Sequence, residues 1–221
     1  MVNLLAIETS GAICSVGLCV DGNRFVRSEH VEKKHNERLL PMLEALREEA
    51  GLSRPALLDA IDTVAFGRGP GSFTGVRIAA AAAQAVALTA GANIVRVSSS
   101  EALSLAASRQ LAGVDGVISA IRSRRDLYYL AAYERTPDGV RRREKDALWE
   151  SAPSFAAARS DWPLVGERPD WWTGRYAETT AADAEALLDV AVKMVANDEA
   201  VAVEAGLPEY FSGDSPWRKS G

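Results

Sequence analysis

The twelve residues FGRGPGSFTGVR, numbered 66–77, decide the fold, because they lead from a short apolar run into a long helix of small residues. The run Ile61–Phe66 predicts a buried strand. The alanine-rich segment 74–90 predicts a helix capped by Ser72 or Thr74. Glycine reaches backbone conformations closed to other residues and proline fixes its own φ, so the residues between strand and helix predict a sharp turn. This glycine corner consists of Gly67, Gly69, Pro70 and Gly71.

Two familiar glycine motifs do not fit this corner. A phosphate-binding P-loop needs a lysine followed by Ser or Thr after its last glycine, and residues 66–77 contain no lysine. The dinucleotide-binding fingerprint needs a third glycine where this chain has Ser72 or Thr74, depending on the register. Two interpretations stay open: a tight turn and nothing more, or a turn whose free amides serve a function.

The composition is that of a globular protein able to bury a core. The chain has 221 residues, of which 48% are hydrophobic and 25% charged, with a formal net charge of −5. No apolar run approaches the roughly 20 residues of a membrane span, and the first residues begin a strand, so we expect a cytoplasmic protein without membrane contact. Cys14 and Cys19 fall on opposite faces of one predicted strand and are not expected to bridge.

The negative net charge argues against nucleic-acid binding driven by the overall field of the protein. One basic cluster lies between Arg122 and Lys145, where arginines alternate with acidic residues. It could contact nucleic-acid phosphates, but a solvated pair of strands is the favoured interpretation, because no aromatic stacking platform accompanies it.

The predicted elements repeat themselves along the chain. A first meander has the turn signal Asp21-Gly22, and its strands lie at 2–7, 13–20 and 23–31. After it come a helix at 35–50, the strand and helix on either side of the corner, a strand at 93–97, and a helix opened by Ser98. A second meander begins at 116–121, continues through 127–135 and turns at Asp138-Gly139, and one clear helix follows near 183–196. We expect two α/β lobes, residues 1–110 and an abridged lobe at 111–221.

The motif GRGPGSFTGVR resembles the signature of the TsaB family, non-catalytic relatives of TsaD in the bacterial tRNA threonylcarbamoyladenosine machinery. Two further stretches are similar to the same family: LAIETS at 5–10, and the residues from His35 to Met42. The resemblance implies a two-lobed actin-like or Hsp70-like ATPase fold, with duplicated βββαβαβα lobes of the ribonuclease H-like kind. The match is strong in the first half of the chain and weak in the second.

In active members of that superfamily, an acidic residue ends the first strand of each lobe and handles metal and water. The corresponding residue of the first lobe is Glu8, so Glu8, Thr9 and Ser10 are interpreted as a vestigial nucleotide loop. The corresponding residue of the second lobe is Arg122, whose positive charge repels Mg²⁺. We therefore expect no catalytic residue and no resident cofactor, with ATP or ADP and Mg²⁺ only at a subunit junction of the complex.

A metal site is also not expected. Catalytic relatives hold a metal through two histidines spaced four apart on a helix, whereas this chain has only His30 and His35. Five residues apart, across a strand end and a helix start, they do not share a helical face. Each is interpreted as a lone exposed histidine.

The helix at 74–90 is apolar nearly all round and must be covered on more than one side, either by the core of its own chain or by a second chain. The resemblance implies the second chain, because two such helices of TsaB-like proteins pair with those of TsaD. The predicted interface residues are His35, Leu39, Leu43, Leu46, Val76, Ala79, Ala80, Ala83 and Ala87. The implied partners are a TsaD-type paralogue, a TsaE-type ATPase, tRNA through the complex, and a second copy of the chain when it is alone.

The hypothesis is thus a scaffold subunit that binds and activates the TsaD-type paralogue. The rivals are an actin-like ATPase or phosphotransferase that uses Glu8, Thr9 and Ser10, and a glycoprotease-like metallopeptidase. The segment from Leu207 to Tyr210 resembles the Pro-x-Tyr ending of the family. It continues as Phe211-Ser212, a departure that puts the role of the tail, including Trp217-Arg218-Lys219, in doubt.

Overall fold

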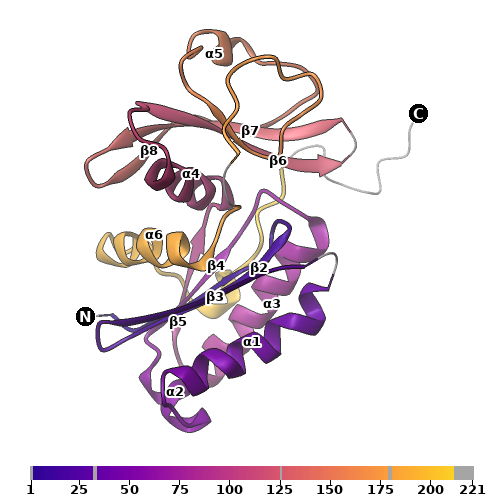
Figure 1. Ribbon diagram of the computed structural model, residues 1–221. Helices are drawn as coiled ribbons and strands as arrows, with labels where there is room; N and C mark the ends of the chain where they lie inside the picture. The colour runs from indigo at the N-terminus through magenta and orange to yellow at the C-terminus, as the bar shows by residue number, and fades with distance from the viewer. Residues whose placement is uncertain (1, 32–33, 125, 179–180, 212–221) are drawn as a thin grey trace.

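The computed structural model describes residues 2–31, 34–124, 126–178 and 181–211. Two sheets stand one above the other, and helices lie between them and outside them (Figure 1). The two-sheet α/β architecture and the repeated meander are those predicted from the sequence.

The first sheet has the order β3-β2-β1-β4-β5. Strands β1, β2 and β3 are antiparallel, whereas β4 and β5 run parallel to β1. Asp21 and Gly22 both have positive φ, 50° and 82°, as the predicted two-residue hairpin requires. The strands are β1 (Leu4–Glu8), β2 (Ile13–Val20), β3 (Asn23–His30), β4 (Thr63–Gly67) and β5 (Asn93–Val97).

The second sheet has the order β8-β7-β6-β9, with three antiparallel strands and the short β9 parallel to β6. Its strands are β6 (Gly116–Arg124), β7 (Leu127–Thr136), β8 (Gly139–Trp149) and β9 (Leu164–Gly166). The second meander is confirmed. Strand β9 was not predicted, because three residues carry no period.

Helices α1 (His35–Glu49), α2 (Arg54–Ala60) and α3 (Phe73–Ala90) cover the lower face of the first sheet (Figure 1). Ser72 caps α3 by accepting a hydrogen bond from the Gly75 amide, and Gly91 ends the helix in the left-handed conformation. The seven-residue α2 buries none of its side chains and was not predicted. Short α5 (Ser154–Ala157) lies beyond the second sheet, and the one-turn helix η1 (Val203–Ala205) follows near the described end.

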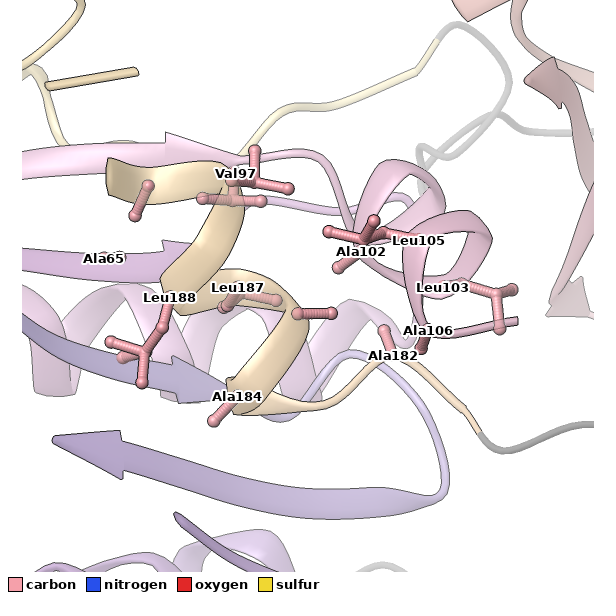
Figure 2. Close-up of a cluster of buried hydrophobic side chains, with 14 of the residues drawn as sticks. Ala65, Val97, Ala102, Leu103, Leu105, Ala106, Ala182, Ala184, Leu187 and Leu188 are labelled. Carbon is pink, nitrogen blue, oxygen red and sulfur yellow. The ribbon is translucent and has the colours of Figure 1, made fainter. Parts of the chain in front are cut away.

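Two helices fill the space between the sheets, and each packs on the sheet formed by the other segment of the chain. Helix α4 (Ser99–Gln110), in the segment 1–110, packs on the second sheet. Helix α6 (Ala184–Ala196), in the segment 111–221, packs on the first. Figure 2 shows the apolar side chains of both helices meeting those of β4 and β5. The boundary at 110/111 stays a prediction, but the lobes on either side of it are not independently packed.

A second buried cluster lies between the first sheet and helices α1 and α3. Cys14 belongs to this cluster and Cys19 to the one between the sheets, so the two free thiols face opposite ways, as predicted. By length and composition α3 could cross a membrane, with a mean hydropathy of 1.3. One side of α3 packs on β4, and 33% of the helix is buried.

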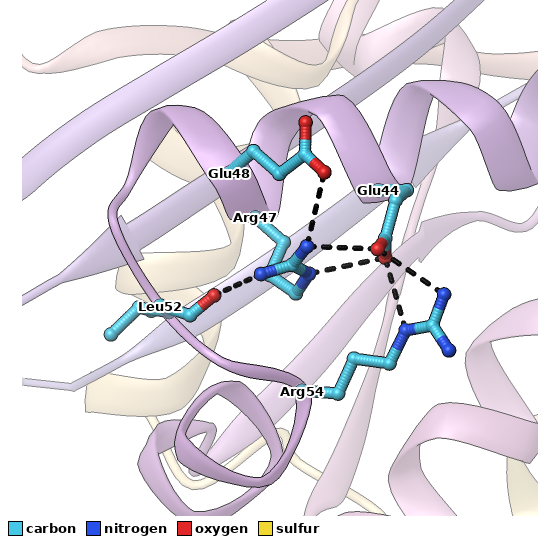
Figure 3. Close-up of polar contacts among 5 residues, drawn as sticks. All are labelled: Glu44, Arg47, Glu48, Leu52 and Arg54. Carbon is cyan, nitrogen blue, oxygen red and sulfur yellow. Dashed lines mark hydrogen bonds and ion pairs between the residues drawn. The ribbon is translucent and has the colours of Figure 1, made fainter.

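A charged network ties the end of α1 to α2 (Figure 3). Arg47 donates to Glu44 at 2.8 Å and to the Leu52 carbonyl, while Arg54 reaches Glu44 at 3.2 Å. Hydrogen bonds from Arg47 and then Arg54 lower the pKa of Glu44 to about 2. The network links α2 to α1, while the partly buried Leu57 and Ala60 pack against the apolar cluster beneath the first sheet and hold the unpredicted helix in place.

Candidate functional site

The glycine corner makes room for the end of β1. A Cβ on Gly67 would collide with the Glu8 carboxylate, and one on Gly75 with the Thr9 carbonyl oxygen. On Gly71 it would lie 2.5 Å from the Ser10 carbonyl oxygen. Three glycines of the signature are therefore required by close approach of the segment 8–10, whereas Gly69, with φ 103°, is required by its own backbone.

Hydrogen bonds fasten the segment 8–10 to the start of α3. The Thr9 hydroxyl donates to the Gly75 carbonyl at 2.7 Å, and the Ser72 amide donates to the Ser10 carbonyl at 2.7 Å. Glu8, Thr9 and Ser10 are all at most 3% exposed. The sequence brought the two motifs to attention separately, and the structure joins them into one unit.

Glu8 is the buried charge of this unit. Its Oε1 accepts from the Ser10 amide at 2.6 Å, and its Oε2 accepts from the Ser99 hydroxyl at 3.0 Å. Burial raises the pKa of Glu8, while the hydrogen bonds from Ser10 and Ser99 oppose that rise. Both carboxylate oxygens thus have partners inside the protein.

The cleft between the lobes has a volume of about 380 Å³ and lies beside the segment 8–10. Ser10 lines it, but Glu8 and Thr9 do not. Its acidic lining residues are Glu167 and Glu178, and His30 is the basic one. A nucleotide triphosphate needs cations or free amides, so among the described residues this lining does not favour phosphate.

Arg122 lies at the end of β6, where the sequence predicted it, and pairs with Glu167 at 3.2 Å. About half of each side chain is exposed, 51% and 48%. The pairing of β6 with β7 shifts between Arg122 and Arg124, so the strand is irregular at this end. The end of β6 is thus occupied by an exposed cation.

The two histidines differ from each other. His30 is exposed, as predicted, but His35 is 8% exposed and its pKa is lowered by burial. The prediction of an exposed His35 was wrong, because the first turn of α1 lies against the segment that follows β1; the groove beside it is lined by Gly11 and Ala12. Across the described ranges, no three His, Cys, Asp or Glu side chains gather as they would around a metal.

The predicted interface residues of α3 need a correction. Val76, Ala79, Ala80, Ala83 and Ala87 are at most 6% exposed and face the first sheet of their own chain. On α1, three of the predicted interface residues are also buried: His35, Leu39 and Leu46. Only Leu43 is half-buried. The nearly uniform alanine composition of α3 gives no clue to which side faces inward, and the prediction chose the inner side.

Both helices expose apolar residues on their outward side, next to charged residues such as Glu37 and Arg38 on α1. On α1, Leu40 is 69% exposed and Pro41 lies beside it. On α3, Leu88 is 72% exposed and follows exposed Ala81 and Ala85 along one side. We call Leu40, Pro41, Leu43, Ile78, Ala81, Ala85 and Leu88 the outer helix surface.

Contacts around the start of α4 escaped the sequence analysis. The Ser100 hydroxyl donates to Asp146 of β8, next to the bond from Ser99 to Glu8. Burial raises the pKa of Asp146 to about 6. The serine run 98–100 was the available signal, but only its capping role was recognised.

The described C-terminal segment returns to the glycine corner. Glu209 pairs with Arg68 at 2.8 Å, and its amide donates to the Arg68 carbonyl at 2.9 Å. The Phe211 ring lies 5.1 Å from that of Tyr129 in the second lobe. Ser212 and Trp217-Arg218-Lys219, singled out in the sequence, lie outside the described residues.

Comparison with known families gives a consistent result. The family model of TsaD, tRNA N6-adenosine threonylcarbamoyltransferase, matches residues 26–157. The tRNA threonylcarbamoyladenosine biosynthesis protein TsaB of Escherichia coli is 33% identical, covering 98% of this chain and 97% of its own length. The protein of the same name from Haemophilus influenzae is 37% identical over 60% of this chain and 54% of its own.

Solved structures agree with these matches. YeaZ from Pseudomonas aeruginosa superposes with a TM-score of 0.81 and 34% identity, over 96% of this chain and 100% of its own. A second structure, described as an uncharacterized protein with similarity to peptidase YEAZ from the same organism, gives 0.82 and 34%, over 95% and 99%. The similarity thus covers both lobes.

Proposed function

Because the chain belongs to the TsaB family of tRNA threonylcarbamoyladenosine biosynthesis proteins, we propose that it is a non-catalytic subunit that binds and activates a TsaD-type paralogue. The modified nucleoside would form next to the anticodon. The observation that carries the proposal is the outer helix surface, an apolar area formed by two helices of one lobe.

The chemistry of this surface fits a helical partner. Small side chains at Ala81 and Ala85 let another helix backbone approach closely, and Leu40 and Leu88 supply large apolar side chains beside them. A paralogue with the same fold would present the same two helices, so the contact would be pseudo-symmetric. In the absence of the paralogue, a second copy of the chain would occupy the surface.

The cleft supports a role without turnover. Glu8 is engaged by Ser10 and Ser99, Arg122 takes the place of the second acidic residue, and Glu167 and Glu178 line the space between them. The ATPase and metallopeptidase alternatives are not favoured by the family match. ATP hydrolysis by the purified chain with Mg²⁺, lost on Glu8→Gln, would nevertheless restore the first of them.

Other parts of the proposal follow from membership of the pathway. The subunit would work in the cytoplasm, a TsaE-type ATPase and tRNA would join through the complex, and any ATP or ADP with Mg²⁺ would lie at a subunit junction. None of these needs a catalytic group from this chain.

The decisive experiment is Ala81→Glu, with co-purification of the TsaD-type paralogue as the measurement. Ala81 is exposed, so a glutamate there leaves the fold intact but places a charge in the apolar contact. Ala157→Glu, on exposed α5 of the other lobe, is the matched control. Ala83→Glu is unsuitable, because Ala83 is fully buried and the charge would unfold the chain.

We expect Ala81→Glu to abolish co-purification, while Ala157→Glu and thermal unfolding of both variants match the wild type. Undiminished capture of the paralogue by a folded Ala81→Glu protein would exclude this surface as the contact.

A further inference from the structure

A second hollow, of about 540 Å³, lies at the end of the first sheet opposite to the glycine corner. The start of β3, the later turns of α4 and α6, and the turn between β7 and β8 enclose it. Figure 1 shows these two helices side by side between the sheets. The proposed paralogue contact, on α1 and α3, lies on the other face of the first sheet.

Basic side chains from four different elements line this hollow. They are Arg24 of β3, Arg109 of α4, Arg135 of β7 and Lys193 of α6. The acidic lining residues are Asp138 and Asp189. Four cations against two carboxylates make the hollow locally positive on a chain whose formal net charge is −5.

Asp189 fixes two of the cations. Its Oδ1 accepts from Arg24 at 2.6 Å, and its Oδ2 accepts from Arg109. Burial raises the pKa of Asp189, but the bonds from Arg109 and Arg24 outweigh that effect and lower it. Each bond engages one nitrogen of a guanidinium that carries five N–H donors. Both guanidinium groups are therefore oriented and keep N–H donors for a ligand.

The other two cations are held by backbone carbonyls. Arg135 donates to the Leu111 carbonyl at 2.8 Å, and Lys193 donates to that of Asp138. At Gly139 a Cβ would come within 2.9 Å of the Lys193 Nζ, so the absence of a side chain gives the lysine room to reach the turn. The four positive groups therefore have defined positions around one space.

Helix ends explain part of this arrangement, because Arg109 and Lys193 lie in the last turns of α4 and α6, where the helix dipole favours cations. They do not explain why two more arginines converge from β3 and β7 on a hollow. Arginine forks match phosphate oxygens in a bidentate manner, and the volume exceeds that of a single phosphate.

We propose that this hollow binds phosphate groups of an RNA backbone. The inference rests on the proposed function in one respect, that the RNA is the tRNA on which the complex acts. The contact would be independent of base sequence, since backbone phosphates position a nucleic acid without specifying it. It would make this subunit a direct participant in tRNA binding as well as a scaffold.

The test is filter binding of a labelled, unmodified tRNA transcript to the purified chain between about 50 and about 200 mM salt. The variant is Arg135→Gln with Lys193→Gln, two exposed side chains whose replacement spares Asp189 and its partners. Arg27→Gln with Arg54→Gln removes the same charge from exposed residues elsewhere and is the matched control. Titration with inorganic phosphate, followed by ³¹P NMR, separates free phosphate from the RNA backbone.

We expect the pocket variant to bind tRNA at least about tenfold more weakly, with the slope of log affinity against log salt reduced by about 1.5 to 2, while the control stays near the wild type. Equal losses in variant and control, or no tRNA binding by the wild type, would overturn the proposal. So would phosphate binding that the variant abolishes while tRNA binding is unchanged. Both double variants should still co-purify with the TsaD-type paralogue, so failure here is distinguishable from failure of the proposed scaffold role.

Discussion

The ends of β1 and β6 occupy equivalent places in the two meanders but are built in opposite ways. At the end of β1, Glu8 is 1% exposed, hydrogen-bonded through both oxygens, and packed where Gly67 leaves space. At the end of β6, Arg122 is half exposed, pairs with Glu167 and lies over the Tyr128 ring, in an irregular stretch of strand. In this duplicated fold, the end of β1 is therefore packed inside the protein, whereas the end of β6 faces solvent.

Helix α4 shows what the buried end of β1 contributes to the structure. Its adjacent serines bind one carboxylate from each sheet, the buried Glu8 through Ser99 and the half-buried Asp146 through Ser100. The Glu8 carboxylate is thus one half of a hydrogen-bonded clamp between the two sheets, and Asp146 is the other half. The comparison teaches that a residue type kept at a strand end says little about function until its partners are known.

The largest expected effect comes from filling the space that Gly75 leaves beside the segment after β1. Gly75→Ala would place a methyl group against the Thr9 carbonyl oxygen, a backbone atom that cannot move aside. We expect a loss of about 3 to 4 kcal/mol in the free energy of unfolding, measured with urea, although alanine normally favours a helix. Gly11→Ala, where nothing lies within 4 Å of the added methyl, should change it by less than about 0.5 kcal/mol. Equal stabilities of the two variants would refute the close-packing argument.

The second-largest expected effect is the pH dependence of stability caused by Asp146, the clamp residue that accepts from Ser100. Burial raises the pKa of Asp146 to about 6 in the folded protein from its ordinary value of 3.8, so between these pH values the folded state holds a proton that the unfolded chain releases. Stability contributed by this group therefore falls as pH rises from about 4 through 6, by about 3 kcal/mol. Asp146→Asn keeps an acceptor for Ser100 and cannot titrate.

Urea unfolding of both proteins at several pH values provides the measurement. The variant should gain stability relative to the wild type across that pH window and hold a constant advantage above it. A difference that does not vary with pH would show that Asp146 is not protonated in the folded protein.

A smaller loss is expected at Glu8 itself. Glu8→Ala leaves the Ser10 amide and the Ser99 hydroxyl without their acceptor, at a cost of about 2 kcal/mol. Glu8→Gln can still accept from Ser10 and can donate to the Ser99 oxygen, so it should stay within about 1 kcal/mol of the wild type. Thermal or urea unfolding at neutral pH decides. An alanine variant as stable as the glutamine variant would mean that these hydrogen bonds contribute nothing.

The smallest expected effect is at the end of β6, which faces solvent. Arg122→Ala removes an exposed pair with Glu167 and should reduce the free energy of unfolding by less than about 1 kcal/mol. A loss as large as that of Glu8→Ala would erase the contrast between the two strand ends.

Local patterns predicted most of the elements, for identifiable reasons. Asp21-Gly22 predicted the hairpin, Ser98 predicted the start of α4 that it caps, and the glycine corner lies between strand and helix as expected. Each of these signals depends on residues close together in the chain. The family signature added the two-lobed architecture.

The chain by itself thus determined most of the strands and helices, the turns that join them and the presence of Arg122 at the end of β6. Only the tertiary structure decided which side of α3 faces the sheet, because nearly uniform alanine leaves both sides equally apolar until a neighbour covers one. It alone also decided that Glu8 is enclosed by Ser10, Ser99 and Gly67, and that α4 and α6 cross to the opposite lobe. The bond from Ser99 to Glu8 joins residues 91 positions apart, and the packing of α6 on β1 joins residues still farther apart, separations that no short-range pattern records.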